Sequence, residues 1–426
     1  MSSQPPLNSP RKLFNLPPAL HHKRFVYLWL GLMISMAGSQ MQLWALYWHI
    51  RSLSNQPIAV SGIGVVRFLP VLIFSLIAGL VADRFDRRKV MFLTQTAMAL
   101  VALALGLLTL SGQVQIWHLY VLTGIQAIAG AFDLPARQAL TPNLVPVKDL
   151  PSAFSMQSIA FDLGAIVGPG LSGIVIGYYG QSYTYLLNAV SFGAVIVALV
   201  LIGPVAQEFT PQPQQPSQSW MAIREGIDFI LHQPIILASM ILDFFATFFS
   251  SANTLLPFVA QDVLHVGPVP YGWLSAAQSM GAVTAAFIIS QRVHIRRQGQ
   301  IMLGAVTFFG LATALFGLSR SFFLTMFSLV LIGASDAVST IIRNTIRQMQ
   351  TPDYIRGRMT SVNQVFFLGG PQLGEIEAGL VAQAFSPSMA ILTGGLGCIA
   401  AVAWIGRRWP QLRNYDDSEL SVATAG

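Results

Sequence analysis

The chain has 426 residues, of which 54% are hydrophobic and only 10% are charged, whereas about a quarter of the residues of a typical soluble domain are charged. This composition excludes a soluble globular protein and indicates an integral membrane protein. The apolar stretches are continuous rather than alternating, which favours spanning helices over a β-barrel. The net charge of +7 would suit a nucleic-acid-binding protein, but the positions of the basic residues give it another explanation.

Twelve membrane-spanning helices are predicted, because each needs about 20 mostly apolar residues. The predicted spans are residues 25–49, 57–82, 90–111, 116–140, 152–176, 183–203, 235–258, 271–291, 300–319, 322–346, 358–384 and 387–406. They group into an N-terminal half (25–203) and a C-terminal half (235–406), with tails at 1–24 and 407–426 and a linker at 204–234. The expected fold class is all-α integral membrane, with two halves of six helices.

The basic residues orient these spans, because cytoplasmic loops carry an excess of Lys and Arg. Only Arg51 and Arg320 fall in loops on one side, and Arg67 lies inside a span. The remaining Lys and Arg residues lie in the tails, in the loops on the other side, or at the span ends that enter them. Both termini are therefore predicted to be cytoplasmic, in a plasma (inner) membrane protein with no nucleic-acid partner. The polar, proline-rich N-terminal tail is predicted to be a cytoplasmic segment that precedes the first span.

The linker between the halves has two parts. "QEFTPQPQQPSQS" is rich in Pro and Gln and is typical of a flexible segment. In the following "WMAIREGIDFILHQP", the apolar residues Trp220, Ile223, Ile227 and Ile230 recur at helical spacing. This pattern predicts a short amphipathic helix that lies on the membrane surface.

The two halves repeat each other with an offset of 206 residues. In this register Gly164, Gly168 and Gly173 correspond to Gly370, Gly374 and Gly379. Slightly upstream, "GAFD" at 130–133 is similar to "GASD" at 333–336. Two parallel repeats of six spans are the architecture of the major facilitator superfamily.

The loop between the second and third spans, "GLVADRFDRRKV", resembles the signature of that superfamily. The matching residues are Gly79, Asp83, Arg84, Arg87 and Arg88, while Asp86 stands where the signature has Gly. The "DRFDRR" form, together with "DLPARQALTPNLVP" at 133–146, resembles bacterial exporters similar to enterobactin and macrolide efflux carriers.

The resemblance implies that this loop clamps the two halves together on the inside while the outside is open. Gly79 would allow a close approach of helices. Asp83 would cap a helix N-terminus or pair with a nearby Arg. The arginines would anchor to anionic lipid head groups. The simpler alternative is a generic positive-inside loop.

"GAIVGPGLSG" in the fifth span resembles the antiporter motif, which implies export. Gly164, Gly168, Pro169 and Gly173 match this motif, and Ser172 replaces one Gly. Glycines permit tight helix packing and Pro bends the helix, and both help to seal a cavity against leak. The alternative is ordinary packing of small residues.

Four aspartates inside the spans are candidates for proton coupling, since intramembrane ionisable residues are functional suspects. Asp243 and Asp162 lie near the expected midplane, where substrate and coupling-ion sites occur. The alternative for both is a structural contact between helices. Asp133 precedes Arg137 by one helical turn, which predicts a structural or gating pair that includes Arg137 in the cytoplasmic gate. Asp336 is the expected counterpart of Asp133 in the second half.

Other polar and aromatic residues are candidates for the substrate cavity. Arg67 must face either a partner or a cavity, and an anionic substrate group is one possible partner. Glu375 and Glu377, near the outer end of span eleven, are expected to have a rim role or to be solvated. Aromatic walls suit large amphipathic ligands, although such residues also face lipid. The candidate cavity residues are Gln40, Trp44, Arg67, Phe244, Phe245 and Phe248.

Several other functions find no support in the sequence. No cluster of His and Cys has metal-ligand spacing, and Cys398 is the only cysteine, so neither a metal nor a disulfide is expected. A P-loop for ATP and a nucleophile–base set are both missing, so no cofactor and no enzymatic activity are expected.

The sequence therefore predicts a monomeric secondary transporter that exports an amphipathic small molecule, either siderophore or drug-like, by proton antiport and alternating access. Its expected partners are the substrate, protons and membrane lipids. Three alternatives are a lipid or lysolipid flippase of the same fold, a non-transporting membrane sensor and a membrane enzyme. A flippase would have a cavity open sideways to the bilayer, and a sensor would have a sizeable domain outside the membrane.

Overall fold

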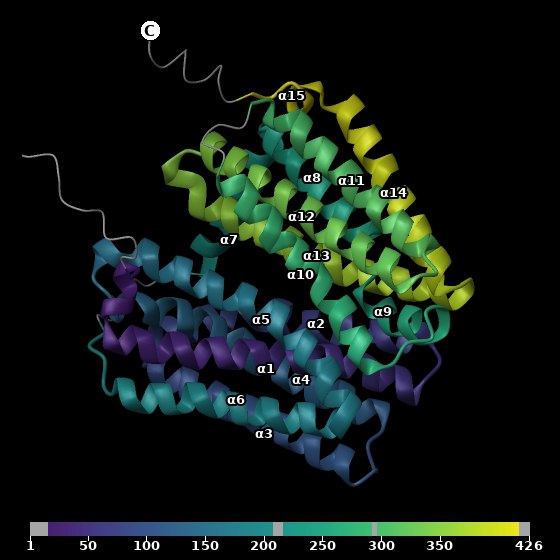
Figure 1. Ribbon diagram of the computed structural model, residues 1–426. Helices are drawn as coiled ribbons and strands as arrows, with labels where there is room; N and C mark the ends of the chain where they lie inside the picture. The colour runs from purple at the N-terminus through teal and green to yellow at the C-terminus, as the bar shows by residue number, and fades with distance from the viewer. Residues whose placement is uncertain (1–15, 208–215, 292–295, 417–426) are drawn as a thin grey trace, which may run out of the picture.

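A computed structural model describes residues 16–207, 216–291 and 296–416, and within these ranges the chain is helical with no strand (Figure 1). The first half contains α1 (Lys23–Leu53), α2 (Pro57–Arg84), α3 (Arg87–Leu110), α4 (Ile116–Leu140), α5 (Leu150–Tyr179) and α6 (Gln181–Ile202). The second half contains α8 (Pro234–Phe249), α9 (Leu256–Phe258), α10 (Pro268–Ser290), α11 (Gln298–Leu318), α12 (Phe322–Gln350), α13 (Asp353–Ala384) and α14 (Pro387–Arg408). The helix α7 (Pro216–His232) precedes the second half, and the short α15 (Pro410–Arg413) follows it.

The twelve predicted spans correspond to these long helices. Within the described residues, 10 segments are long and apolar enough to cross a membrane. The two remaining helices, α1 and α13, have 31 and 32 residues and carry more polar side chains along their length. Their polarity is explained by their positions, because α1 and α13 pack against several other helices instead of presenting one broad face to lipid.

The seventh span is discontinuous, whereas the sequence predicts one unbroken helix at 235–258. The helix α8 ends at Phe249, and the chain resumes as the 3-10 turn Asn253–Leu255, then α9, then a π-helical turn at Val259–Val263. Pro257 lies at the start of α9, where its missing N–H costs no helical hydrogen bond. The irregular backbone is buried between the halves, which is where a membrane protein can accommodate it.

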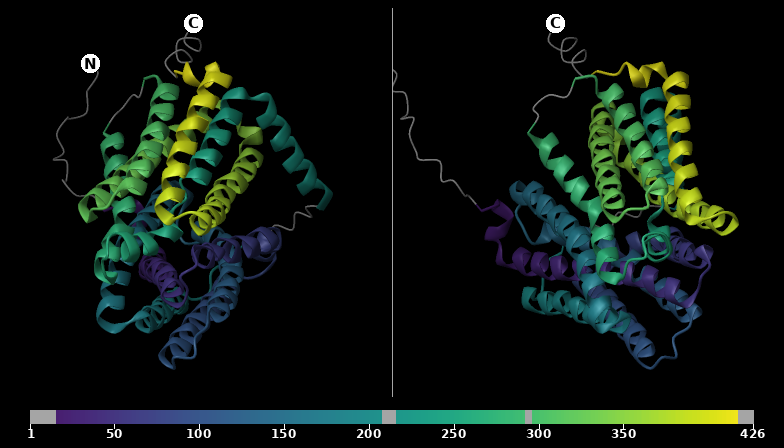
Figure 2. Two further views of the ribbon diagram at one scale, coloured as in Figure 1. Left: turned by 90° about the vertical axis from the view of Figure 1, so that its right-hand side faces the viewer. Right: turned by 45° about the vertical axis from the view of Figure 1, so that its right-hand side comes forward.

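The two halves meet at one end of the molecule and diverge toward the other, as the views in Figures 1 and 2 show. The end that carries the start of α1, the helix α15 and the turn between α2 and α3 is called the basic end here, and the opposite end is called the closed end. Between the halves, α5 packs on α10 and α2 packs on α13. Their closest contacts lie near the ends Tyr179 and Ala384, so the structure is open toward the basic end.

The repeated glycines make equivalent contacts in the two halves. Gly164 of α5 lies against the backbone of α1 at Met36, and its counterpart Gly370 of α13 lies against α8 at Thr247. Gly173 lies against α10 at Gly272, and its counterpart Gly379 lies against α2 at Ser61. In each half, the fifth spanning helix therefore uses its glycines to pack on the first helix of its own half and on the second helix of the other half.

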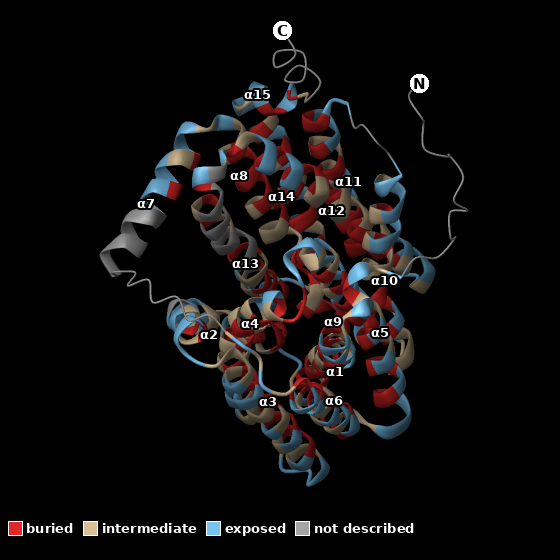
Figure 3. Ribbon diagram, turned by 90° about the vertical axis from the view of Figure 1, so that its left-hand side faces the viewer, coloured by how far each residue is buried: buried red, intermediate tan, exposed pale blue. Residues whose placement is uncertain are grey.

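The linker contains the predicted amphipathic helix as α7, and Figure 3 shows that its described part is largely exposed. Ile230 is buried against Met359 and Val362 of α13, while Ile227 stays exposed. Trp220 and Ile223 lie outside the described side chains. Because part of the apolar stripe packs on α13, it is not available as a whole to the membrane surface, and a surface position for the rest of α7 stays a prediction.

Candidate substrate cavity and gates

A cavity of about 360 Å³ lies within the first half, between α1, α2, α3, α4, α5 and α6. Apolar side chains such as Met36 and Phe161 form part of its wall. A second cavity of about 410 Å³ shares four lining residues with the first and extends beside α4 and α5 toward the basic end. The polar lining of the first cavity is Ser35, Ser39, Gln40, Gln42, Arg67, Gln95, Thr123, Gln126, Asp133 and Arg137.

Amide groups hold this cavity wall in place. Gln42 of α1 donates a hydrogen bond to Gln126 of α4 at 2.5 Å, and it accepts one from Asn188 of α6 at 2.6 Å. These buried bonds link three helices without a charge. Gln40, a predicted cavity residue, also lines the cavity, and its Cβ atom packs against Gly168 of α5.

Asp133 and Arg137 do not form the pair that their spacing predicts. The buried carboxylate of Asp133 accepts hydrogen bonds from Thr94 at 3.0 Å and Gln95 at 2.9 Å, both on α3. Arg137 is half-buried, lines both cavities, and has no side-chain hydrogen bond or ion pair with the described part of the chain. The reason is that two α3 donors already satisfy Asp133, which leaves the Arg137 charge facing the cavity.

Arg67 lies at the other end of the cavity, toward the closed end. The Tyr47 hydroxyl of α1 and the Glu375 carboxylate of α13 are its electrostatic neighbours among the described residues, but Arg67 forms no ion pair with this carboxylate. Arg67 also acts electrostatically on Glu375, which is 5% exposed. The expectation of a solvated or rim position for Glu375 is wrong, because α13 packs this residue against Gly64 of α2. Glu377, half-exposed, lies outside this contact.

Further polar contacts cross between the halves at the closed end. Arg51 of α1 forms an ion pair with Asp262 of the second half at 2.7 Å, and its guanidinium lies 4.8 Å from the Phe258 ring centroid. The hydroxyls of Ser61 and Thr254 are 3.1 Å apart. These contacts, together with the α5–α10 contact at Gly173 and Gly272, close this end.

Trp44 belongs to the closed end and not to either cavity. It is buried, its backbone carbonyl accepts a hydrogen bond from the Tyr271 hydroxyl of α10 at 3.0 Å, and the two rings meet edge to face. Trp48 packs on the same Tyr271 ring with centroids 4.8 Å apart. The aromatic pattern of α1 therefore predicts burial correctly but assigns Trp44 to the wrong surface.

Phe244, Phe245 and Phe248 also lie outside both cavities. Phe244 stacks on Phe248, and Phe245 packs on Phe249 and on Trp404 of α14. The rings thus fill space around α8 inside the second half. Their spacing along the sequence is compatible with a cavity face, but it cannot distinguish that face from a packed one.

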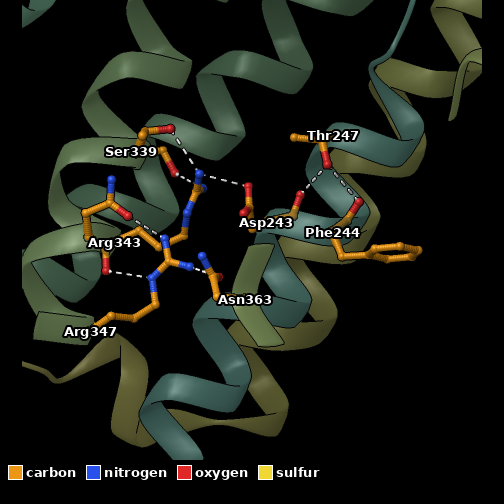
Figure 4. A network of polar contacts seen from close by, with 9 residues as sticks. Asp243, Phe244, Thr247, Ser339, Arg343, Arg347 and Asn363 are labelled. Atoms are coloured by element: carbon orange, nitrogen blue, oxygen red, sulfur yellow. Dashed lines mark hydrogen bonds and ion pairs between the residues drawn. The ribbon is translucent and has the colours of Figure 1, made fainter. Parts of the chain in front are cut away.

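Asp243 forms a buried ion pair in the second half (Figure 4). Its carboxylate lies 2.8 Å from the Arg343 guanidinium of α12, and both side chains are 2% exposed. Arg343 also donates to Ser339 at 3.2 Å and to Thr340 at 2.9 Å. The partner of Asp243 is therefore Arg343, a residue that the sequence analysis does not single out.

Two more charged residues complete this second-half cluster. Asp336, two helical turns before Arg343 on α12, interacts electrostatically with both Arg343 and Asp243. Arg347 donates to the Arg343 carbonyl, to Asn344 and to Asn363 of α13. The cluster thus contains two acids and two bases and links α8, α12 and α13.

Asp162, the remaining proton-coupling candidate, is exposed on α5 between the exposed residues Phe161 and Leu163. It has no side-chain hydrogen bond or ion pair within the described ranges. It lies in the middle part of α5, and it faces outward because the neighbouring helix face, with Gly164 and Gly168, is the one that packs on α1.

In the charged loop between α2 and α3, some charged residues bind to the first half and others are exposed. Asp86, and not Asp83, caps a helix: its carboxylate accepts from the backbone N–H of Arg88 at 3.0 Å and of Lys89 at 3.3 Å. Arg87 donates to Asn143 and to the Ala139 carbonyl.

Arg88 also binds to the first half, whereas Asp83 and Arg84 do not. It donates to the Leu199 carbonyl near the end of α6 at 2.7 Å, where a cation suits the helix C-terminus. Asp83 and Arg84 are exposed, without a side-chain partner among the described residues. The predicted close approach at Gly79 is not found either: an added Cβ there would meet nothing within 4 Å, because the halves diverge at this end.

Within the described residues, no group of three or more His, Cys, Asp or Glu side chains could hold a metal ion. The candidate substrate cavity, the contacts at the closed end and the exposed Asp83 and Arg84 are the polar features that bear on function.

Comparisons with known proteins agree with this arrangement. The profile of a family described as "Transmembrane secretion effector" matches residues 16–423. Among curated relatives, the enterobactin exporter EntS of Citrobacter koseri is 27% identical over 325 residues, which covers 76% of this chain and 77% of that protein. EntS of Escherichia coli (strain 536 / UPEC) is 26% identical over 352 residues, which covers 82% and 83%.

Solved structures of transporters share the fold. The nucleoside transporter NupG superposes with a TM-score of 0.66 at 14% identity, covering 92% of this chain and all of that chain. A bacterial homologue of the human lysosomal transporter Spinster, in an inward-facing conformation, gives 0.69 at 14% identity and covers 94% and 97%. A bacterial homologue of the iron transporter ferroportin, also inward-facing, gives 0.67 at 15% identity and covers 92% and 99%.

Proposed function

Because the chain belongs to the transmembrane secretion effector family of the major facilitator superfamily, and is thus a multi-pass inner-membrane transporter and not an enzyme, we propose that it exports an amphipathic small molecule of the siderophore type by proton antiport. The observation that carries this proposal is the first-half cavity, which combines apolar walls with Arg67 and Arg137 and adjoins a second cavity toward the basic end. The relatives named as enterobactin exporters support the siderophore class.

The distribution of Lys and Arg supports a cytoplasmic position for the basic end and for both termini. The structure would then represent the state that accepts substrate from the cytoplasm. Alternating access requires the opposite state, in which α2 and α13 separate at the closed end and approach at the basic end. The monomer contains both halves and would carry out this cycle alone, in contact with membrane lipids.

The register of α2 and α13 supports a clamp role for Asp83. These antiparallel helices place Phe68 opposite Gly369 and Gly64 opposite Gln372. Both helices rise about 1.5 Å per residue, so the same register leads from Asp83 to the first turn of α13. A carboxylate at a helix N-terminus is stabilised by the unpaired N–H groups there. Closure of the basic end would therefore give Asp83 the partner that it lacks in the open state.

Proton coupling is assigned to the Asp243 cluster. A proton on Asp243 would remove one charge of the ion pair with Arg343 and so loosen the link between α8 and α12. Asp336, which faces the same guanidinium, is the second carboxylate of this proposal. Asp162 is the next candidate, since its carboxylate has no hydrogen-bond or ion-pair partner among the described residues, while Asp133 is held by two donors of α3.

The test is transport of enterobactin into proteoliposomes that contain the purified protein, with an imposed pH gradient and after its collapse. We expect accumulation that depends on the gradient. A macrolide and a fluorescent lysolipid, tested in parallel, report on drug export and on lipid flipping. Accumulation of the lysolipid alone would favour the flippase, and absence of transport for all three, with tightly sealed vesicles, would contradict the exporter proposal. In cells that lack the protein, siderophore trapped inside under iron limitation is the matching observation.

A further inference from the structure

Arg67 belongs to two sites at once, the substrate cavity and the contact that closes the opposite end. It lines the cavity of the first half. It also lies one helical turn from Gly64, which packs on Glu375 of the second half, and it acts electrostatically on that carboxylate and on the Tyr47 hydroxyl. An anion that binds Arg67 would therefore weaken an attraction between the halves.

The Glu375 side of this contact is incompletely satisfied. Glu375 is 5% exposed, and its Oε2 atom has no hydrogen-bond donor within the part of the chain that the structure describes. The Oε1 atom of the neighbouring Gln372 also lacks a donor within the described residues, and a Cβ added at Gly64 would lie 2.9 Å from the Glu375 oxygen and 3.3 Å from this one. A buried carboxylate with one free oxygen depends on the remaining charge partner, which is Arg67.

We propose that Arg67 acts as a latch that binds an anionic group of the transported molecule, in competition with Glu375 and Tyr47. The ligand class is an amphipathic molecule with a carboxylate or a phenolate. Arg137, which faces the cavity nearer the basic end and has no partner in the described chain, would meet the anion first. Arg67 would bind it at the deep end, and the weakened attraction between Arg67 and Glu375 would start the opening of the closed end.

Charge accounting supports an anionic ligand. The cavity is lined by two guanidinium groups and one carboxylate. That carboxylate, Asp133, accepts hydrogen bonds from Thr94 and Gln95 and forms no ion pair with either of the two described arginines, so the lining keeps an excess of one positive charge. A buried cation that loses its partner without gaining another is unfavourable, so only an anion can replace Glu375 at Arg67 without that cost.

Binding in nanodiscs tests this latch. The latch proposal rests on the proposed function, which identifies the cavity as the substrate site, but ligand binding is measured here without transport. The matched probes are 2-naphthoate and the neutral 2-naphthamide, measured by equilibrium dialysis against empty nanodiscs. We expect wild type to prefer naphthoate by about tenfold or more, the range of a charge-assisted hydrogen bond. Arg67→Gln should abolish this preference and leave naphthamide binding unchanged.

The variant Glu375→Gln separates the latch from a simple anion site. It removes the competitor, so naphthoate should bind about tenfold more tightly than to wild type, whereas naphthamide should not change. Glu377→Gln is the matched control on the same helix and should behave as wild type. Tyr47→Phe, which removes only a hydroxyl, should strengthen naphthoate binding by a smaller factor and provides a second variant if Glu375→Gln does not fold.

The conformational arm uses spin labels at two exposed positions of the closed end, Gln56→Cys and Ser321→Cys. Naphthoate should shift the distance distribution to longer values, and Glu375→Gln should do so without ligand. Equal binding of the two probes to wild type would overturn the anionic ligand class. Unchanged naphthoate affinity and unchanged distances in Glu375→Gln would overturn the latch, even if export of enterobactin is demonstrated.

Discussion

Gly173 offers a direct way to test whether the contact between α5 and α10 determines which end of the transporter is open. A Cβ atom at this position would lie 2.5 Å from the Pro268 carbonyl oxygen and 2.7 Å from the Gly272 Cα. Both neighbours are backbone atoms, which cannot move aside as a flexible side chain can. Gly173→Ala therefore requires α5 and α10 to separate by about 1 Å to reach ordinary van der Waals distance.

This separation raises the free energy of the state in which α5 and α10 are in contact, which is the state open toward the basic end. Overpacking of this kind costs about 1–3 kcal/mol, and each 1.4 kcal/mol changes an equilibrium constant about tenfold. The population open toward the basic end should thus fall relative to the opposite state by a factor between about 5 and 150. Gly170→Ala is the matched control, since an added Cβ there meets nothing within 4 Å on the same helix.

The assay is the distance distribution between spin labels at Gln56→Cys and Ser321→Cys, in nanodiscs without substrate. Gly173→Ala should lengthen this distance, while Gly170→Ala should reproduce wild type. Native Cys398 is buried and should not take up label. An unchanged distribution for Gly173→Ala, with normal folding, would mean that the two halves do not meet at this contact in the membrane, and the reasoning would be refuted.

Three further predictions concern the remaining sites. Asp83→Asn should insert normally and cut export severely, because the state that is closed at the basic end loses a charge-assisted contact worth roughly 1.5–3 kcal/mol. Normal transport at equal expression would remove the clamp role. Gly168→Leu should leave the protein in the membrane but inactive or leaky, since even a Cβ would lie 2.6 Å from the Ala37 carbonyl, and wild-type export with a tight proton gradient would contradict this. Asp243→Asn should still exchange substrate but fail to concentrate it under a pH gradient; gradient-driven accumulation equal to wild type would shift the coupling role to Asp162.

Much of the fold was predictable because a bilayer imposes a strong length requirement on apolar segments. The spans around α3, α6 and α11 coincide with their predicted ranges within a few residues. The break after Phe249 was not predictable from hydropathy, since the irregular residues are compensated by partners from the other half.

The site was predictable to a smaller extent. Small residues at a fixed repeat correctly indicated close packing at Gly168 and Gly173, because few side chains permit it. The partners of charged residues could not be predicted: Asp243 pairs with Arg343, a hundred residues later, and Glu375 is attracted electrostatically by Arg67 of the other half. Such pairs depend on how the helices are arranged, and one sequence contains no record of that arrangement. Asp86, which departs from the family signature, provides the helix cap that was expected of Asp83.

The buried pair of Asp243 and Arg343 has a consequence for the synthesis of the protein. The helix α8 must enter the bilayer with its aspartate long before α12 has been made, and translocon scales assign about 2.5–3.5 kcal/mol to such a charge at a helix centre. The strong hydropathy of this span, with a mean of 1.8, offsets that cost during insertion. Arg343 is inserted three spans later with a similar free-energy cost. The ion pair between the two side chains offsets the cost of both charges. The second half can therefore complete its packing only when α12 docks, so truncation before this helix should leave α8 inserted but unassembled, a natural substrate for membrane quality-control proteases.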